Sequence, residues 1–176
     1  MTEENSQEIN EHKRLGHQFI IAMWILAMVL IYFIFNNIIN RDHNPNQDVV
    51  FSESPNGSKV VTLQRNRAGH YVTSGRINNQ PVTFILDTGA TDIAIPQNIA
   101  RALKLRRGAE SYYQTANGTA LGYQTMLDSV SVGNIRLHHI PASIVTNMDD
   151  SEILLGMSFL KHIEFSQRGD TLILQQ

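Results

Sequence analysis

The chain has 176 residues, of which 14 are basic and 16 acidic, so its formal net charge is -2. This length accommodates one domain of roughly 100 to 150 residues plus an appendage. The balanced charge argues against the basic surface of a nucleic-acid binder, and the lack of cysteine excludes disulfides, thiolate metal sites and a cysteine nucleophile.

The first element in chain order is an apolar run from Phe19 to Phe35, 17 residues without a charge, which continues through two asparagines to Ile39. A helix rising about 1.5 Å per residue over 19–39 is long enough to cross a hydrocarbon core of about 30 Å. A cleaved signal peptide would have a shorter apolar core and small residues at a cleavage site, and a buried globular helix would have a polar face. The sequence therefore predicts a retained transmembrane helix over 19–39.

The basic residues around this run predict its orientation. Lys13 and Arg14 precede it, whereas only Arg41 stands close behind it. Because basic residues favour the cytoplasmic side of a membrane, the tail over 1–18 is expected in the cytoplasm and the remainder of the chain outside it. The two sides of the apolar run differ by a single basic residue.

The segment after the apolar run, 40–58, is polar and contains Pro45, Pro55 and Gly57. Such a composition is typical of a flexible connection, because proline and glycine interrupt regular structure and polar side chains have little apolar surface to bury. We therefore expect a flexible tether over 40–58 and a folded domain that begins near Lys59.

The sequence from 59 to 176 has the pattern of short strands separated by turns. Its β-branched, partly alternating segments favour strands, and Gly and Asn mark the turns between them. One segment, 96–105, begins with a proline and has apolar residues at helical spacing, which predicts a short helix. The pattern indicates a mostly β barrel or sandwich with one or two short helices. The expected strands fall within 59–66, 70–77, 81–87, 111–132, 132–145, 152–165 and 166–176.

Asp87 is a charge at the end of a strand that otherwise reads as buried. It follows the apolar residues 84–86, so its carboxylate would be costly to bury unless it were hydrogen-bonded or used in chemistry. Thr88 adds a hydroxyl, and Gly89 permits close backbone approach. An isolated Asp-Thr-Gly often simply ends a strand in a turn, so the surrounding sequence decides between the two interpretations.

The surrounding motifs occur in a fixed order. Residues 85–91 read ILDTGAT, 111–123 read SYYQTANGTALGY with a turn-forming Asn-Gly pair, and 153–156 read ILLG. In this order they resemble the active-site loop, the β-hairpin flap and the second signature of the retropepsin-like aspartic proteases, the single-domain relatives of pepsin that include the retroviral proteases. The segments RNRAGHY, LLGMSFL and RGDTLIL are similar to bacterial membrane-anchored members. The resemblance extends from about Arg65 to about Leu174.

The resemblance implies a single-lobed closed β-barrel, the acid protease fold, over 59–176, and an aspartic endopeptidase activity. Enzymes of this class hydrolyse peptide bonds with two carboxylates that share one proton around a water molecule. Because the chain has a single Asp-Thr-Gly, the second carboxylate would come from a second chain. We therefore expect a homodimer in which Asp87 of each chain forms the catalytic pair and Thr88 of each chain fixes the two loops across the symmetry axis.

The resemblance also implies roles for the residues around Asp87. The rest of its active-site loop comprises Thr88, Gly89, Ala90 and Thr91. Residues expected in the flap are Tyr112, Tyr113, Thr115, Asn117 and Gly118, with the last two at the tip. Residues expected to support the loop are Asp92, which contacts substrate or caps the loop, Leu155 and Gly156.

The chain departs from the retroviral pattern after the second signature. Met157 and Ser158 stand where retroviral members carry Arg and then Asp or Asn, and Thr91 stands where they carry Asp. The pairing between Arg and Asp that helps to hold retroviral dimers is therefore not expected here. The sequence has no Gly-rich phosphate loop and no cluster with zinc-ligand spacing, so neither a cofactor nor a metal is implied.

Three functions are compatible with the sequence. The first is an aspartic endopeptidase anchored in a bacterial inner membrane, with a periplasmic domain that cleaves envelope or exported proteins and releases itself by cutting the tether. The second is an inactive module that binds extended peptides by strand addition. The third is a structural anchor whose β-domain oligomerises. The intact Asp87, Thr88 and Gly89 favour the first over the second, and the third leaves the charge of Asp87 unexplained.

Overall fold

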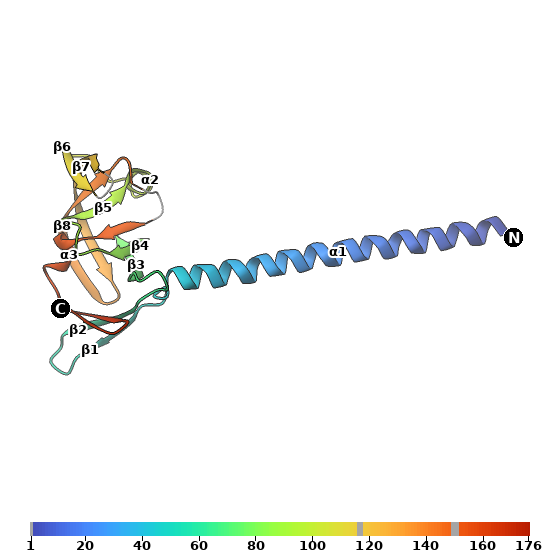
Figure 1. Cartoon of the computed structure of the whole chain (residues 1–176), viewed down its shortest axis with the longest axis horizontal. Helices are drawn as coiled ribbons and strands as arrows, with labels where there is room; N and C mark the ends of the chain where they lie inside the picture. The colour runs from blue at the N-terminus through green and yellow to red at the C-terminus, as the bar shows by residue number, and fades with distance from the viewer. Residues whose placement is uncertain (1, 116–117, 149–151) are drawn as a thin grey trace. The chain divides into compact units, whose positions relative to one another are not determined.

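A computed structural model of the chain describes residues 2–115, 118–148 and 152–176 (Figure 1). The chain divides into two compact units, Met1–Asn40 and Arg41–Gln176. Helix α1 (Thr2–His43) makes up the first unit, and its last residues belong to the second. From Phe19 to His43 it has the length and composition of a membrane span or a signal sequence, and its large apolar side chains are exposed. The predicted apolar helix is therefore present and is longer than 19–39.

The second unit is built mostly from strands, as predicted. Its strands are β1 (Val50–Glu53), β2 (Lys59–Gln64), β3 (Val72–Ile77), β4 (Gln80–Leu86), β5 (Ile93–Pro96), β6 (Glu110–Thr115), β7 (Gly118–Val132), β8 (Ile135–Val145), β9 (Ile153–Leu155), β10 (Glu164–Arg168) and β11 (Thr171–Gln175). Its helices are α2 (Gln97–Ala102), which lies within the predicted helical segment 96–105, and α3 (Met157–Leu160).

The strands form two sheets. One sheet has the order β1-β2-β11-β10, and the other has the order β3-β4-β9-β5-β8-β7-β6. In the second sheet β3 also pairs with β7, so the pairings from β3 through β4, β9, β5, β8 and β7 return to β3. Such a closed circuit of strands is the connectivity of a small barrel. The predicted single-lobed β fold is confirmed.

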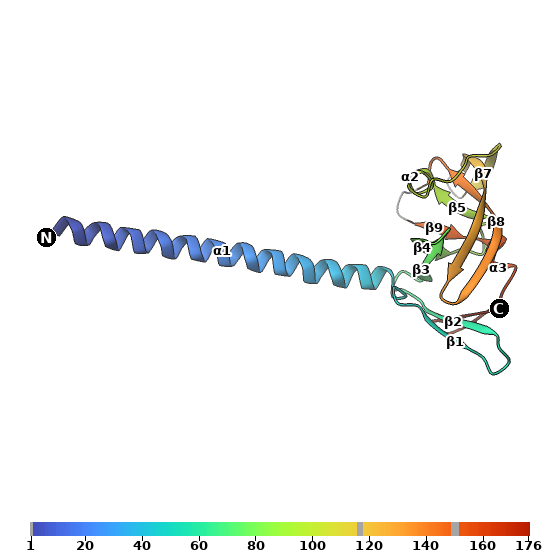
Figure 2. The same cartoon turned by 180° about the vertical axis from the view of Figure 1, so that it is seen from behind.

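The turns explain how the sequence sets the strand register. Asn78 and Asn79 have positive φ angles of 48° and 66°, as required for the tight turn that joins β3 to β4. Gly133 has a φ of 56° in the predicted turn between β7 and β8. These two long strands pair antiparallel along most of their length, and Figure 2 shows them side by side along the domain. Strand β7 also pairs with β6 to form the predicted hairpin.

The core of the second unit lies on the inner faces of both sheets. Phe84 of β4 and Ile153 of β9 are fully buried and stand opposite each other in a parallel pair. Phe159 of α3 is also fully buried, so this short helix is fixed by its apolar face. The parallel pairing continues to Leu86 and Leu155, which brings the end of β4 beside the end of β9. The core therefore places the two signature motifs next to each other.

The folded unit begins earlier than predicted. The sequence analysis made 40–58 a flexible tether, but Asn44 and Asn46 are buried, and strand β1 lies within this segment and pairs with β2. The physical reason is that the two asparagine side chains satisfy backbone polar groups of the domain instead of facing water. Composition alone does not distinguish these two uses of asparagine.

Candidate active site

Asp87 stands directly after β4, between two strands that hold its backbone. Its N–H donates to the carbonyl of Leu155 on β9, with N and O 3.2 Å apart. The preceding N–H, of Leu86, donates to the carbonyl of Tyr71 at 3.0 Å. The main chain on entering the Asp-Thr-Gly loop is therefore fixed from both sides, which limits the positions that the Asp87 side chain can take.

The carboxylate of Asp87 is half-buried and hydrogen-bonded within its own loop. Its Oδ1 accepts a hydrogen bond from the N–H of Gly89 at 2.8 Å. The backbone carbonyl of Asp87 accepts a second one from the N–H of Ala90 at 3.3 Å. A Cβ atom at Gly89 would lie 3.1 Å from the same Oδ1, so a larger residue at this position would crowd the carboxylate. Thr88 and Thr91 are exposed. The loop thus turns around one carboxylate and presents it beside exposed hydroxyls.

The second signature supports the loop through backbone contacts. The N–H groups of Met157 and Ser158 donate to the carbonyls of Ala90 and Thr91, at 2.8 and 2.9 Å. The hydroxyl of Ser158 accepts a hydrogen bond from Ile93 at 3.0 Å. The start of α3 therefore bonds three groups of the segment that follows Asp87, and Leu155 and Gly156, which are expected to support the loop, stand directly before this helix.

Ser158→Ala should destabilise the domain by about 1–3 kcal/mol, because it leaves the buried N–H of Ile93 without its acceptor. Denaturant unfolding of the full chain measures this effect. Ser52→Ala on the exposed strand β1 is the matched control and should leave the free energy of unfolding unchanged. Equal stability of the two variants would show that the Ser158 hydroxyl does not hold the loop.

Asp92 is bonded to a different strand. Its Oδ2 accepts a hydrogen bond from the hydroxyl of Ser143, which is buried on β8, at 3.1 Å. Asp92 is half-buried. The carboxylate nearest to Asp87 in sequence is therefore engaged with β8. Ser143 was missed by the sequence analysis, because a serine inside a strand carries no signal of its own.

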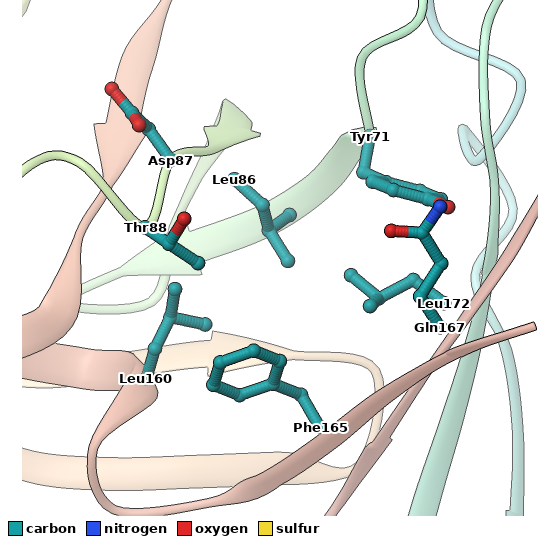
Figure 3. Close-up of a pocket in the computed structure, with 8 residues that line it drawn as sticks. All are labelled: Tyr71, Leu86, Asp87, Thr88, Leu160, Phe165, Gln167 and Leu172. Carbon is teal, nitrogen blue, oxygen red and sulfur yellow. The ribbon is translucent and has the colours of Figure 1, made fainter.

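A hollow of about 310 Å³ lies beside Asp87. Figure 3 shows Asp87 and Thr88 on one side of it and Tyr71 and Gln167 on the other. The hydroxyl of Tyr71 is buried and has no hydrogen-bond partner among the described residues. The apolar side chains that line the hollow are Leu86, Leu160, Phe165 and Leu172. A surface of this kind next to a carboxylate can accommodate an apolar segment of another molecule.

The hairpin of β6 and β7 corresponds to the predicted flap. Thr115 and Gly118 form its last described pair, and the predicted tip residue Asn117 lies outside the described residues. Tyr112 is 73% exposed, whereas Tyr113 is half-buried with its ring against Gly122. The two tyrosines therefore differ: Tyr113 packs in the hairpin and Tyr112 is available to a ligand.

Within residues 2–115, 118–148 and 152–176, no three His, Asp or Glu side chains gather closely enough to hold a metal ion. The described part of the site thus consists of one carboxylate, hydroxyls, backbone amides and an apolar hollow.

The comparisons with known proteins match this arrangement. A model of the family described as "gag-polyprotein putative aspartyl protease" matches residues 73–162, about half of the chain. The crystal structure of a retropepsin-like aspartic protease from Rickettsia conorii superimposes with a TM-score of 0.58 at 32% sequence identity, covering 72% of this chain and 95% of that one. The chain belongs to the retropepsin-like aspartic protease family.

Two uncharacterized bacterial proteins are also similar to this chain. An uncharacterized protein in the cobV 5' region of Sinorhizobium sp is 30% identical over 168 residues, which cover 88% of this chain and 72% of the relative. An uncharacterized Rickettsia prowazekii protein is 34% identical over 119 residues, 65% of this chain and 50% of that relative. The matched residues 73–162 of this retropepsin-like chain include the Asp-Thr-Gly loop, the β6–β7 hairpin and helix α3.

Proposed function

We propose that this retropepsin-like protein is a membrane-anchored aspartic endopeptidase that is active as a homodimer. One Asp87 from each chain would hold a water molecule, and the pair would share one proton while the water attacks the scissile peptide carbonyl. The observation that carries the proposal is the setting of Asp87, half-buried at the end of β4 and bonded through Gly89 beside an open hollow.

The need for a second chain follows from the count of suitable carboxylates. The chemistry requires two, the chain has one Asp-Thr-Gly, and Asp92 is engaged with Ser143. Beside Asp87, the apolar hollow and the edge strand β10, all of whose residues are exposed, offer a surface that a second copy can cover. A two-fold axis near Asp87 would bring both carboxylates and both Thr88 hydroxyls together.

The substrate in this proposal is an extended peptide segment held under the β6–β7 hairpin. The hairpin is joined to the body of the domain by the long strand β7. Tyr112, with its exposed ring, and the exposed Thr119 near the tip are the residues that we expect to contact a bound peptide. Closure of such a hairpin would exclude water from the reacting bond.

The location in this proposal is a bacterial inner membrane. Helix α1 from Phe19 to His43 would span it, and Lys13 and Arg14 before the span would keep the N terminus in the cytoplasm. The folded unit would then face the periplasm and act on envelope or exported proteins. Anchoring in a plane raises the local concentration of the chains, which supports formation of a weak dimer.

Hydrolysis of an unstructured protein such as casein by the detergent-solubilised full chain tests the proposal. We expect cleavage between about pH 3 and about pH 8 with an optimum on the acidic side, because one carboxylate of the pair must keep its proton. The Asp87→Asn variant should not cleave. If the wild-type chain is a folded dimer but cleaves at no pH, the peptide-binding module becomes the better interpretation.

A further inference from the structure

The segment that joins helix α1 to the folded unit is bonded to the domain at several points. We call residues 42–46 the juxtamembrane clip. It begins at the end of the apolar span, which extends to His43, and it lies within the folded unit. Asp42 forms an exposed ion pair with Arg67 at 2.9 Å, and the carbonyl of His43 accepts a hydrogen bond from Asn66 at 2.9 Å. The clip is therefore attached to the turn before β3 from its first residue.

Asn46 is the most extensively bonded residue of the clip. It is 4% exposed, and its side-chain amide donates to the carbonyls of Gln64 and Val72 at 2.9 and 2.6 Å. Its side-chain oxygen accepts from the N–H of Gln64 at 2.7 Å. Gln64 ends β2 in one sheet and Val72 begins β3 in the other. One side chain thus joins the two sheets.

The backbone of Asn46 continues this attachment. Its carbonyl accepts a hydrogen bond from Ser74 at 3.1 Å, and the residue pairs in parallel with Thr73. Its N–H donates to the side-chain oxygen of Asn44 at 3.0 Å, while the Asn44 amide donates to the Ser74 hydroxyl at 3.2 Å. The clip therefore acts as a short extra strand on β3.

From β3 the contacts lead to the Asp87 loop. The carbonyl of Val72 accepts a hydrogen bond from the side-chain amide of Asn46, and Val72 pairs with Ile85 on β4. The neighbouring Tyr71 carbonyl accepts the hydrogen bond from Leu86, the residue before Asp87. The clip thus contacts β3, and β3 pairs with β4, the strand that ends directly before Asp87.

A second set of contacts reaches the same loop through β9. The ring nitrogen Nε2 of His43 contacts the carboxylate of Glu152, which is buried immediately before β9. Leu155, at the other end of this short strand, accepts the hydrogen bond from the N–H of Asp87. A buried carboxylate is costly without a partner, so loss of His43 would disturb the start of β9. The two backbone anchors of the Asp87 loop therefore lie directly before β3 and at the end of β9, and the clip contacts β3 and the residue before β9.

We propose that the juxtamembrane clip positions Asp87, with Asn46 as its central positioning residue. The inference rests on the proposed protease function for its effect on catalysis, but its structural part is independent of activity. It follows that self-release by a cut after Asn46 should lower activity, because such a cut would separate the clip from the domain.

Hydrogen exchange and kinetics of the full-length Asn46→Ala variant test the proposal. We expect the amides of Leu86 and Asp87 to exchange at least about tenfold faster than in the wild-type chain, because the strands that fix them lose a support. On casein, kcat should fall by about 10- to 100-fold with KM little changed, since a small misplacement affects the reacting group more than substrate binding. Asn56→Ala, in an exposed turn of the same polar segment, should change neither quantity.

The two measurements distinguish a failure of the clip inference from a failure of the proposed protease function. If the wild-type chain does not hydrolyse casein, the exchange rates at Leu86 and Asp87 still decide whether the clip supports the loop. Unchanged exchange in Asn46→Ala would overturn the inference. If that variant does not fold, the milder Ser74→Ala removes only the acceptor of the Asn44 amide. It should raise the exchange rate at the same two amides by a few-fold, and an unchanged rate would again overturn the inference.

Discussion

Replacing Asp87 by Asn is expected to abolish peptide hydrolysis while leaving the chain folded and dimeric. The amide keeps the size of the side chain and can still accept the hydrogen bond from Gly89 through its oxygen. It cannot take a proton from water, so the loss in kcat should be at least about 10²- to 10⁴-fold. Casein hydrolysis, circular dichroism and sedimentation of the purified variant measure the three properties separately.

A surface carboxylate provides the control for this variant. Asp128 is exposed on β7, and Asp128→Asn makes the same chemical change away from the candidate site. It should hydrolyse casein at the wild-type rate. Retained hydrolysis in Asp87→Asn would contradict the role of Asp87.

Mixed dimers test whether the two carboxylates act as one pair. Wild-type and Asp87→Asn chains with different affinity tags can be co-expressed, and dimers that contain one of each isolated by two successive purifications. A shared pair predicts that these mixed dimers are inactive, because each site needs Asp87 from both chains. Half of the wild-type activity in the mixed dimers would instead show that each chain carries a complete site.

The strands and turns were accessible to sequence reasoning because their signals are local. The Asn78-Asn79 turn adopts the positive φ angles that its sequence favours, and the apolar residues before Asp87 are a strand. The connection between the signatures came from the family resemblance, since no local rule predicts that residues 84–86 pair in parallel with 153–155. Long-range pairing depends on the packing of the whole core.

The contacts of polar residues could not be predicted in the same way. Asn46, Ser143 and Ser158 are buried and bonded to groups far away in the sequence, but a serine or an asparagine carries no sequence signal for such bonds. A polar side chain is favourable inside a protein only when particular partners surround it, and those partners are known only from the fold. For this reason the polar composition of 40–58 predicts a tether where the clip lies, and Ser158 stands out in the sequence only as a departure from the retroviral pattern.

Gly156→Ala is expected to have the largest effect on stability among substitutions near the site. A Cβ atom at this position would lie 2.2 Å from the carbonyl oxygen of Asp92 and 2.6 Å from that of Ala90. Both are backbone atoms of the segment that follows Asp87, and the Ala90 carbonyl cannot move without breaking the hydrogen bond that it accepts from Met157. We expect a loss of at least about 3 kcal/mol in the free energy of unfolding, the upper end of the usual cost of overpacking.

Gly169→Ala is the informative control because it separates crowding from backbone strain. Gly169 has a positive φ of 59° in the turn between β10 and β11, but a Cβ atom there would meet no atom within 4 Å. Its replacement should cost only about 1–2 kcal/mol, from the conformation alone. If Gly156→Ala were no more destabilised than this control in denaturant unfolding, the backbone at Ala90 and Asp92 would be able to move aside for the added Cβ atom. The displaced loop should also reduce hydrolysis in any Gly156→Ala chain that still folds, because the neighbours of Gly156, Leu155 and Met157, bond the backbone of Asp87 and Ala90.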